Sequence, residues 1–259
     1  MTLEPLQYLL GALSGSVVGL VLGLVGGGGS ILAVPLIVYL VGVTSPHLAI
    51  GTSALAVAAN AATGLANHAR HGHVKWRCAI VFAVAGIAGA AIGSTVGKSF
   101  DGQRLLFLFA LVMIAVGILM LRRRGAGGNA EVKLARDNAL KLVGFGFGAG
   151  LFSGFFGIGG GFLIVPGLIA ATGMPMIYAV GSSLVAVTAF GLTTAANYAL
   201  SGLVDWILAG VFVAGGLLGS AVGTRAAKKL AAAGHLNQVF AALIFVVAAY
   251  MLWKSGSAL

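Results

Sequence analysis

Long apolar stretches alternate with short polar connections along the whole chain. Lys, Arg, Asp and Glu are absent from 78–97, 105–121, 142–204 and 206–224, and about 20 apolar residues suffice to cross the hydrocarbon of a bilayer. The pattern predicts an all-α polytopic membrane protein. Its apolar segments number ten, at roughly 6–25, 29–43, 47–67, 76–97, 104–121, 140–157, 160–173, 177–200, 206–224 and 236–253.

Runs of glycine interrupt this pattern twice, in similar surroundings. Residues 23–35 read GLVGGGGSILAVP and residues 154–166 read GFFGIGGGFLIVP. Irregular backbone at membrane depth is tolerated only against other protein or beside a water-filled cavity. Breaks at equivalent places of two inverted halves are typical of the binding site of a secondary transporter. The sequence therefore predicts Gly-broken or re-entrant helices near the midplane.

The rest of the chain is duplicated as well, since GTSALAV at 51–57 matches GSSLVAV at 181–187. We expect an N-terminal transmembrane repeat (1–121), a basic linker (122–141) and a C-terminal transmembrane repeat (142–259). Five segments per half is an odd number, which predicts inverted repeats. Joining the short second segment of each half to the first would instead give four crossings per half and parallel repeats.

The charged connections favour inversion. Lys and Arg concentrate in the linker and in loops 68–77 and 225–235, which predicts that these three lie in the cytoplasm and both termini outside. Loop 200–205 contains Asp205 and no basic residue, as expected of an external loop. Loop 98–104 is ambiguous because it contains Lys98 and Arg104 beside Asp101.

Composition narrows the class of protein further. The chain is 59% hydrophobic and 8% charged, against about 25% charged in soluble domains. Its net charge of +10 lies mainly in loops, so we expect no nucleic-acid partner. A single cysteine, Cys78, excludes an internal disulfide and a multi-cysteine metal site. We expect no cofactor and no metal, and we expect the first apolar segment to be retained because MTLEPLQYLL has no Lys or Arg.

The glycine breaks are candidates for an anion site. Helices that begin just after them, at Ser30 and Gly161, would point free N–H groups and positive dipole ends toward the break. Glycine lets the backbone reach a ligand because it lacks Cβ. The alternative is close helix packing, which we favour for Gly86, Gly89, Gly93 and their repeat partners. The predicted substrate-binding glycines and serine are Gly27, Gly28, Gly29, Ser30, Gly159, Gly160 and Gly161.

Polar side chains in the apolar segments are further candidates. Hydroxyls suit oxyanion oxygens but also back-bond to the preceding helical turn, and buried amides either contact substrate or join helices. The candidates are Thr52, Ser53, Ser182, Ser183, Asn60, Asn67 and Asn197. His47 is a possible proton-sensitive group. His68 and Arg70 belong to a basic stretch that we interpret as a solvated loop, with an anion-concentrating vestibule as the alternative.

The doubled GxxGGGGSxLxVP and GxxGIGGGFLxVP signatures carry a resemblance to a known family. Together with GTS or GSS downstream, and with Asn, Gly and Trp at 67, 72, 76 and at 197, 202, 206, the chain resembles the sulfite exporter TauE/SafE family over about 15–250. The resemblance implies transport of sulfite, thiosulfate, sulfoacetate or related sulfonates across the bacterial inner membrane. The first copy departs from the second by having Gly27 and Ser30 where the second has Ile158 and Gly161, so the half-sites need not contribute equally.

We therefore predict a transporter of small sulfur-containing anions that works in the direction of export. The apolar segments contain no carboxylate for proton or sodium coupling, and an anion leaving a negative-inside cell gains about 2.3 kcal/mol per charge per 100 mV. An anion channel of the same fold is one alternative. An intramembrane serine hydrolase using GTSA at 51–54 is the other, although Tyr198 stands where the first half has His68.

Overall fold

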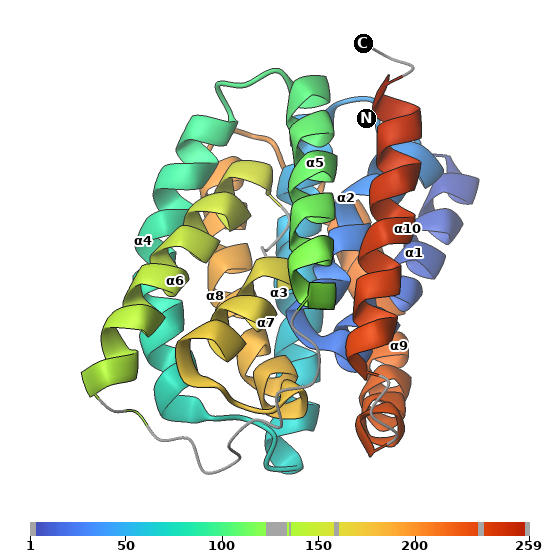
Figure 1. Cartoon of the computed structure of the whole chain (residues 1–259). Helices are drawn as coiled ribbons and strands as arrows, with labels where there is room; N and C mark the ends of the chain where they lie inside the picture. Colours follow the sequence, from blue (N-terminus) through green and yellow to red (C-terminus); the bar gives the residue numbers. More distant parts are fainter. Residues whose placement is uncertain (1–3, 123–133, 135, 158–160, 233–235, 257–259) are drawn as a thin grey trace.

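The computed structural model describes residues 4–122, 134, 136–157, 161–232 and 236–256, and within these ranges it contains helices and no strand (Figure 1). Six helical runs are long and apolar enough to cross a membrane, and three shorter apolar helices accompany them. The prediction of an all-α polytopic membrane protein is confirmed. The elements are α1 (Pro5–Val25), the 3-10 segment η1 (Gly26–Leu32), α2 (Ala33–Pro35), the π segment η2 (Leu36–Leu40), α3 (Pro46–Arg70), α4 (Trp76–Gly97), α5 (Gly102–Arg122), α6 (Arg136–Phe156), α7 (Gly161–Thr172), α8 (Met176–Ala199), α9 (Trp206–Ala232) and α10 (Leu236–Gly256).

The chain reverses direction at the first glycine run. Gly26 ends α1 with φ +66°, and the backbone of Gly29 lies against that of Leu22, seven residues earlier. In a straight helix residues seven apart are separated by about 10 Å along the axis. Further along, Gln7 Nε2 donates to the carbonyl oxygen of Val41 at 3.0 Å. The first two apolar segments therefore form a hairpin rather than one broken crossing.

The returning segment consists of η1, α2 and η2 and reaches the level of Gln7 at Val41, with fewer residues than α1 uses. The rings of Tyr39 and Tyr250 are 5.7 Å apart. The start of α1 and the end of α10 therefore lie at the same end of the bundle.

Helices of one half pack mainly on helices of the other (Figure 1). α1 runs along α9 and α6 along α4, while α3 crosses α8 at the centre and α5 packs on α10. Glycines make the closest contacts, because a Cβ at these positions would overlap the facing backbone. On α1, Gly15, Gly19 and Gly23 face Phe212, Gly216 and Ser220; on α6, Gly146, Gly150 and Gly154 face Phe82, Gly86 and Ala90.

The close-packing interpretation of Gly86, Gly89 and Gly93 is confirmed, because each faces an α6 backbone or the Phe190 ring. The contacts also pair equivalent positions of the two halves, so the sequence duplication is a structural one. That the halves are inverted relative to a membrane stays a prediction. The division into two repeats and a linker also stays a prediction. In the structure, α6 begins at Arg136, inside the predicted linker.

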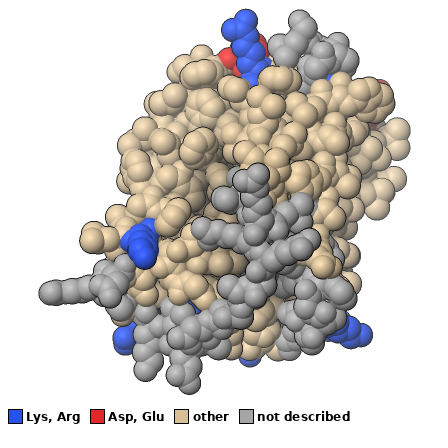
Figure 2. All heavy atoms as spheres, viewed as in Figure 1, with Lys and Arg blue, Asp and Glu red and all other residues tan. Residues whose placement is uncertain are grey.

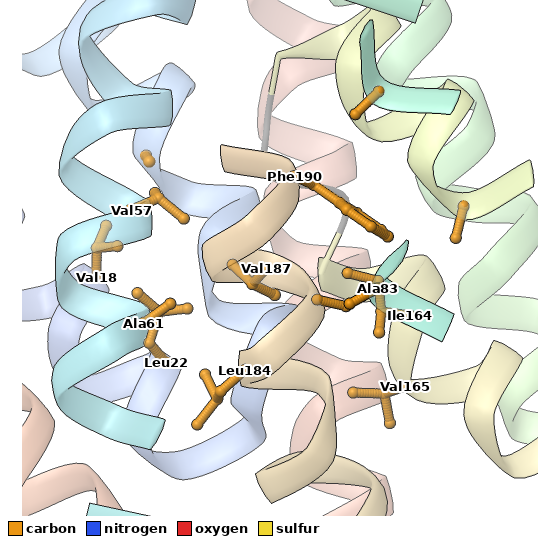
Figure 3. Packing of buried hydrophobic residues seen from close by; sticks show 14 of the residues in the cluster. Val18, Leu22, Val57, Ala61, Ala83, Ile164, Val165, Leu184, Val187 and Phe190 are labelled. Atoms are coloured by element: carbon orange, nitrogen blue, oxygen red, sulfur yellow. The ribbon is translucent and has the colours of Figure 1, made fainter. Parts of the chain in front are cut away.

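The buried interior is apolar and the outer surface is apolar too. Val18 and Leu22 of α1, Val57 and Ala61 of α3, and Val187 of α8 meet at the centre of the bundle (Figure 3). Figure 2 shows one face of the molecule on which, among the described residues, Lys and Arg stand toward the margins and uncharged residues make up the area between them. Large apolar side chains stand on the outside of several helices, as expected of a surface in contact with lipid.

Candidate functional site

The two interrupted regions meet at the centre of the bundle. A Cβ on Gly161, the first residue of α7, would overlap the backbone of Gly27. A Cβ on Gly27 would stand 2.6 Å from Gly161 Cα and 2.6 Å from Val187 Cγ2. Ser183 Oγ accepts a hydrogen bond from the Gly27 N–H at 3.0 Å and donates to the Val180 carbonyl oxygen at 2.7 Å. The structure thus brings Gly27, Gly161 and Ser183 together, while Gly159 and Gly160 lie outside the described residues.

The remaining residues of the first break are fully enclosed. Gly28, Gly29 and Ser30 are buried, and Ser30 Oγ donates to the Gly27 carbonyl oxygen at 2.8 Å. A Cβ on Gly29 would overlap the α1 backbone at Leu22. Close backbone approach alone therefore accounts for glycine at position 29. Substitution of Gly29 would test the packing of the hairpin rather than the space for a ligand.

The duplicated hydroxyls hold the backbone at equivalent places in the two halves. Thr52 Oγ1 accepts from the Asp205 N–H at 2.9 Å, just before α9 begins. Ser182 Oγ accepts from the Lys75 N–H at 2.8 Å, just before α4 begins. These bonds between the halves were not predicted, because sequence spacing does not show which segment a side chain faces.

The other hydroxyl of each pair follows the alternative interpretation. Ser53 Oγ donates to the Ile50 carbonyl oxygen at 2.9 Å, as Ser183 does to Val180. Back-bonding to the preceding turn is therefore confirmed at both positions. Each hydroxyl still has acceptor capacity, and Ser183 uses it for the first glycine break.

Two of the three candidate amides lie toward helix ends. Asn197 is half-buried, and its Oδ1 accepts from Lys98 Nζ at 2.7 Å. Its Nδ2 donates to Ser94 Oγ at 2.6 Å, so Asn197 joins α8 to α4, which agrees with the helix-joining alternative. Asn67 is also half-buried, and its backbone carbonyl oxygen, not its side-chain amide, lies 2.6 Å from Nδ1 of His71.

Asn60 differs from every other candidate. It lies in the middle of α3 with no exposed surface, and neither Nδ2 nor Oδ1 has a hydrogen-bond partner among the described residues. A Cβ on Gly216 of α9 would overlap its amide. Ser220, one turn further along α9, is likewise fully buried with an unpartnered hydroxyl. Gly64 of α3 lies beside Ser220, since its Cβ would stand 3.4 Å from Ser220 Oγ.

Sequence reasoning missed Ser220, although a signal was present. Ser220 occupies the repeat position of Ala90, and Asn60 occupies that of Phe190. The two polar residues thus form a pair that the second half replaces with apolar side chains. Positions where a duplicated chain departs from its own repeat toward polar residues can be found without a structure.

The histidines lie at two separate places. His47 is half-buried, with Nε2 3.0 Å from the Phe100 carbonyl oxygen. His68 is fully buried, with Nε2 3.0 Å from the Gly23 carbonyl oxygen and Nδ1 3.3 Å from Nδ1 of His73. The interpretation of this stretch as a solvated loop is wrong for His68, because the residue falls on the last turns of α3 facing α1. Arg70 is exposed but is the last residue of α3 rather than part of a loop.

This arrangement defines a class of protein. A bundle of membrane helices that brings two interrupted helices together at its centre has the architecture of a polytopic membrane transporter. Residues 11–251 match the family described as "Sulfite exporter TauE/SafE", and the chain belongs to this family. The family predicted from the duplicated motifs is confirmed.

Relatives along the whole chain have names of the same kind. A "Probable membrane transporter protein" of Xylella fastidiosa (strain 9a5c) is 52% identical over 261 residues, which cover 100% of this chain and 99% of that protein. The "Probable membrane transporter protein YunE" of Bacillus subtilis (strain 168) is 26% identical, over 87% of this chain and 90% of that protein. These names describe transporters rather than enzymes. No solved structure matches the chain.

Proposed function

We propose that the protein exports small sulfur-containing anions, such as sulfite, thiosulfate or an organosulfonate, across the bacterial inner membrane. The anion binds where the two interrupted helices meet. The observation that carries the proposal is the backbone contact between Gly27 and Gly161, the point where the interrupted regions of the two halves meet. A change in the relative position of the halves would open or close this point to either side of the membrane.

The charge distribution supports an anion that moves outward. No Lys, Arg, Asp or Glu occurs in 5–69, 142–204 or 206–224, so binding falls to backbone N–H groups, helix dipoles, hydroxyls and amides. A negative-inside membrane potential drives an anion out by about 2.3 kcal/mol per charge per 100 mV. The excess of basic residues in the linker and in loops 68–77 and 225–235 supports a cytoplasmic position for them, with both termini outside.

The test is flux through the purified protein in proteoliposomes. Vesicles loaded with sulfite, thiosulfate, sulfoacetate, sulfate or chloride are given an outward driving potential, and efflux is measured against internal concentration. We expect saturable efflux of at least one sulfur-containing anion and counterflow of its labelled form. Folded protein that moves none of the sulfur-containing anions would refute the proposal, and flux without saturation or counterflow would replace the transporter with a channel.

Two alanine variants test whether the anion binds where the two glycine breaks meet. Gly161→Ala would push its Cβ into the Gly27 backbone, whereas Gly148→Ala on α6 meets nothing within 4 Å. We expect efflux to be lost in Gly161→Ala and retained in Gly148→Ala, with both proteins monodisperse. Normal efflux in Gly161→Ala would exclude the crossing of the two breaks as the transport site.

A further inference from the structure

The Asn60 amide and the Ser220 hydroxyl lack an explanation as structural groups. Both are fully buried, and neither has a hydrogen-bond partner in the described part of the chain. An unpaired amide or hydroxyl inside a membrane protein is strongly destabilising. Buried polar groups in native proteins almost always have a partner, and where protein supplies none, the partner is a water or a ligand.

This polar pair belongs to one half only. Phe190 occupies the repeat position of Asn60, lies against Gly86 as Asn60 lies against Gly216, and stacks on Phe82 with ring centroids 6.4 Å apart. Figure 3 shows Phe190 on the far side of α8 from Val57 and Ala61, the α3 residues that flank Asn60 in sequence. At the equivalent contact between α8 and α4 the repeat positions carry Phe190 and Ala90, and the hydroxyl of Thr194, one turn beyond Phe190, is also fully buried without a partner among the described residues. The amide of Asn60 thus has no counterpart in the second half.

The side chains around Asn60 and Ser220 determine which net charge on a bound anion is tolerated. α1 and residues 46–69 of α3 lie within 5–69, the part of α9 that faces them lies within 206–224, and neither range contains Lys, Arg, Asp or Glu. The fully buried titratable side chain on these segments is His68 of α3, whose Nε2 lies 3.0 Å from the carbonyl oxygen of Gly23, the glycine that faces Ser220. The cost of moving an ion out of water rises with the square of its charge, whereas its attraction to neutral dipoles rises only in proportion to the charge. Without a cationic side chain, such a site tolerates a single negative charge far better than two.

The hydrogen-bonding groups add a second requirement. The Asn60 amide presents N–H donors and a carbonyl acceptor, and the Ser220 hydroxyl can donate or accept. A fully deprotonated oxyanion can only accept, so it would leave Asn60 Oδ1 unpaired. An oxyanion that keeps one proton can accept from Nδ2 and donate to Oδ1.

We propose that Asn60 and Ser220 form a subsite for singly charged oxyanions, with the protonated form of sulfite preferred over sulfite itself and over other dianions. This inference rests on the proposed function, and it specifies the ionic form that Asn60 and Ser220 accept. Sulfonates of net charge −1 satisfy the charge requirement, whereas sulfate and thiosulfate do not.

The experiment is calorimetric titration of the detergent-purified full chain with sulfite, methanesulfonate, sulfate and thiosulfate between about pH 6 and pH 8. Methanesulfonate keeps one charge throughout this range and therefore corrects for titration of the histidines. Sulfite loses its second proton near neutral pH. We expect its apparent affinity to fall by up to about tenfold per pH unit at the alkaline end, with methanesulfonate unchanged and both dianions at least about tenfold weaker.

A matched pair of variants on α3 identifies the residue. Asn60→Leu is expected to weaken binding of every anion by about tenfold or more, yet to raise the thermal midpoint because it removes an unpaired buried amide. Thr63→Ala, which removes a half-buried hydroxyl that donates to Ala59 at 3.2 Å, should change neither binding nor midpoint appreciably.

Different results of these experiments would refute the preference for one charge and the proposed transport of anions. Dianions that bind as tightly as methanesulfonate, or a sulfite affinity that does not change with pH, would overturn the preference for one charge. Unchanged binding together with a lower midpoint in Asn60→Leu would make the amide structural. No binding of any anion by the folded wild-type protein would refute the proposed function itself.

Discussion

The close contact between α1 and α9 predicts that glycine-to-alanine substitutions at two positions change the free energy of unfolding in opposite directions. A Cβ on Gly19 would stand 2.6 Å from Gly216 Cα, whereas ordinary contact begins at 3.4 Å, so the two helices would have to separate by about 1 Å. Overpacking of this kind costs about 1–3 kcal/mol, and alanine returns up to about 1 kcal/mol through its higher helix propensity. With the full propensity gain subtracted, Gly19→Ala should lower the free energy of unfolding by up to about 2 kcal/mol.

Gly210→Ala on α9 is the matched control, because a Cβ there meets nothing within 4 Å. It keeps the gain in helix propensity without the overlap, so it should raise the free energy of unfolding by about 0.5–1 kcal/mol. Reversible unfolding in mixed detergent and SDS micelles, followed by tryptophan fluorescence, measures both changes. A stabilising effect of Gly19→Ala, equal to that of Gly210→Ala, would refute the close packing of α1 on α9.

The duplication extends this prediction to the other half. A Cβ on Gly150 would stand 2.6 Å from Gly86 Cα, the same distance as in the contact of Gly19 with Gly216. Gly150→Ala should match Gly19→Ala within about 0.5 kcal/mol, and the double variant should be additive to the same degree because the two contacts share no partner. A large difference between the single variants would show that the two interfaces are not equivalent.

Three further predictions concern individual hydrogen bonds and use the same unfolding assay. Ser183→Ala leaves the buried Gly27 N–H without its acceptor and should lower the free energy of unfolding by about 1–3 kcal/mol. The control Thr193→Ala loses only a bond to Ala189 and should change it by no more than about 0.5 kcal/mol. Equal effects of the two variants would contradict the role of Ser183. His68→Leu leaves the Gly23 carbonyl oxygen without the imidazole and should lower the free energy of unfolding by about 1–3 kcal/mol. His68→Gln should lower it less, because the glutamine amide can still donate. The reverse order would show that packing of the imidazole ring matters more than the hydrogen bond. Lys98→Met removes bonds to Asn197 and Ser201 at a half-exposed position and should cost no more than about 1 kcal/mol, and a larger loss would mean that this cluster is more strongly shielded from water than its exposure indicates.

Much of the architecture could be predicted because it follows from local composition. Charge-free stretches delimit the helices, and a repeated glycine run marks where each half is interrupted. The pairing of helices could not be predicted in the same way. A glycine at position 19 fits many close contacts, and only the folded chain shows that its neighbour is Gly216.

The candidate site was predicted in outline and less well in detail. Gly27, Gly161 and Ser183 do come together, but glycine at position 29 is explained by contact with Leu22. Thr52 and Ser182 anchor the starts of α9 and α4, so hydroxyls in an apolar helix can serve the fold alone. The structure sets Asn60 apart because neither atom of its amide has a hydrogen-bond partner among the described residues.

The pairing of helices across the halves also determines the order in which contacts can form during synthesis. Gly19 leaves the ribosome about 200 residues before Gly216, which at about 5–20 residues per second is an interval of about 10–40 s. During this time the glycine face of α1 has no α9 to pack against. The nascent first half must therefore hold its helices in the bilayer as an open assembly, and the native bundle closes only when the second half has been inserted.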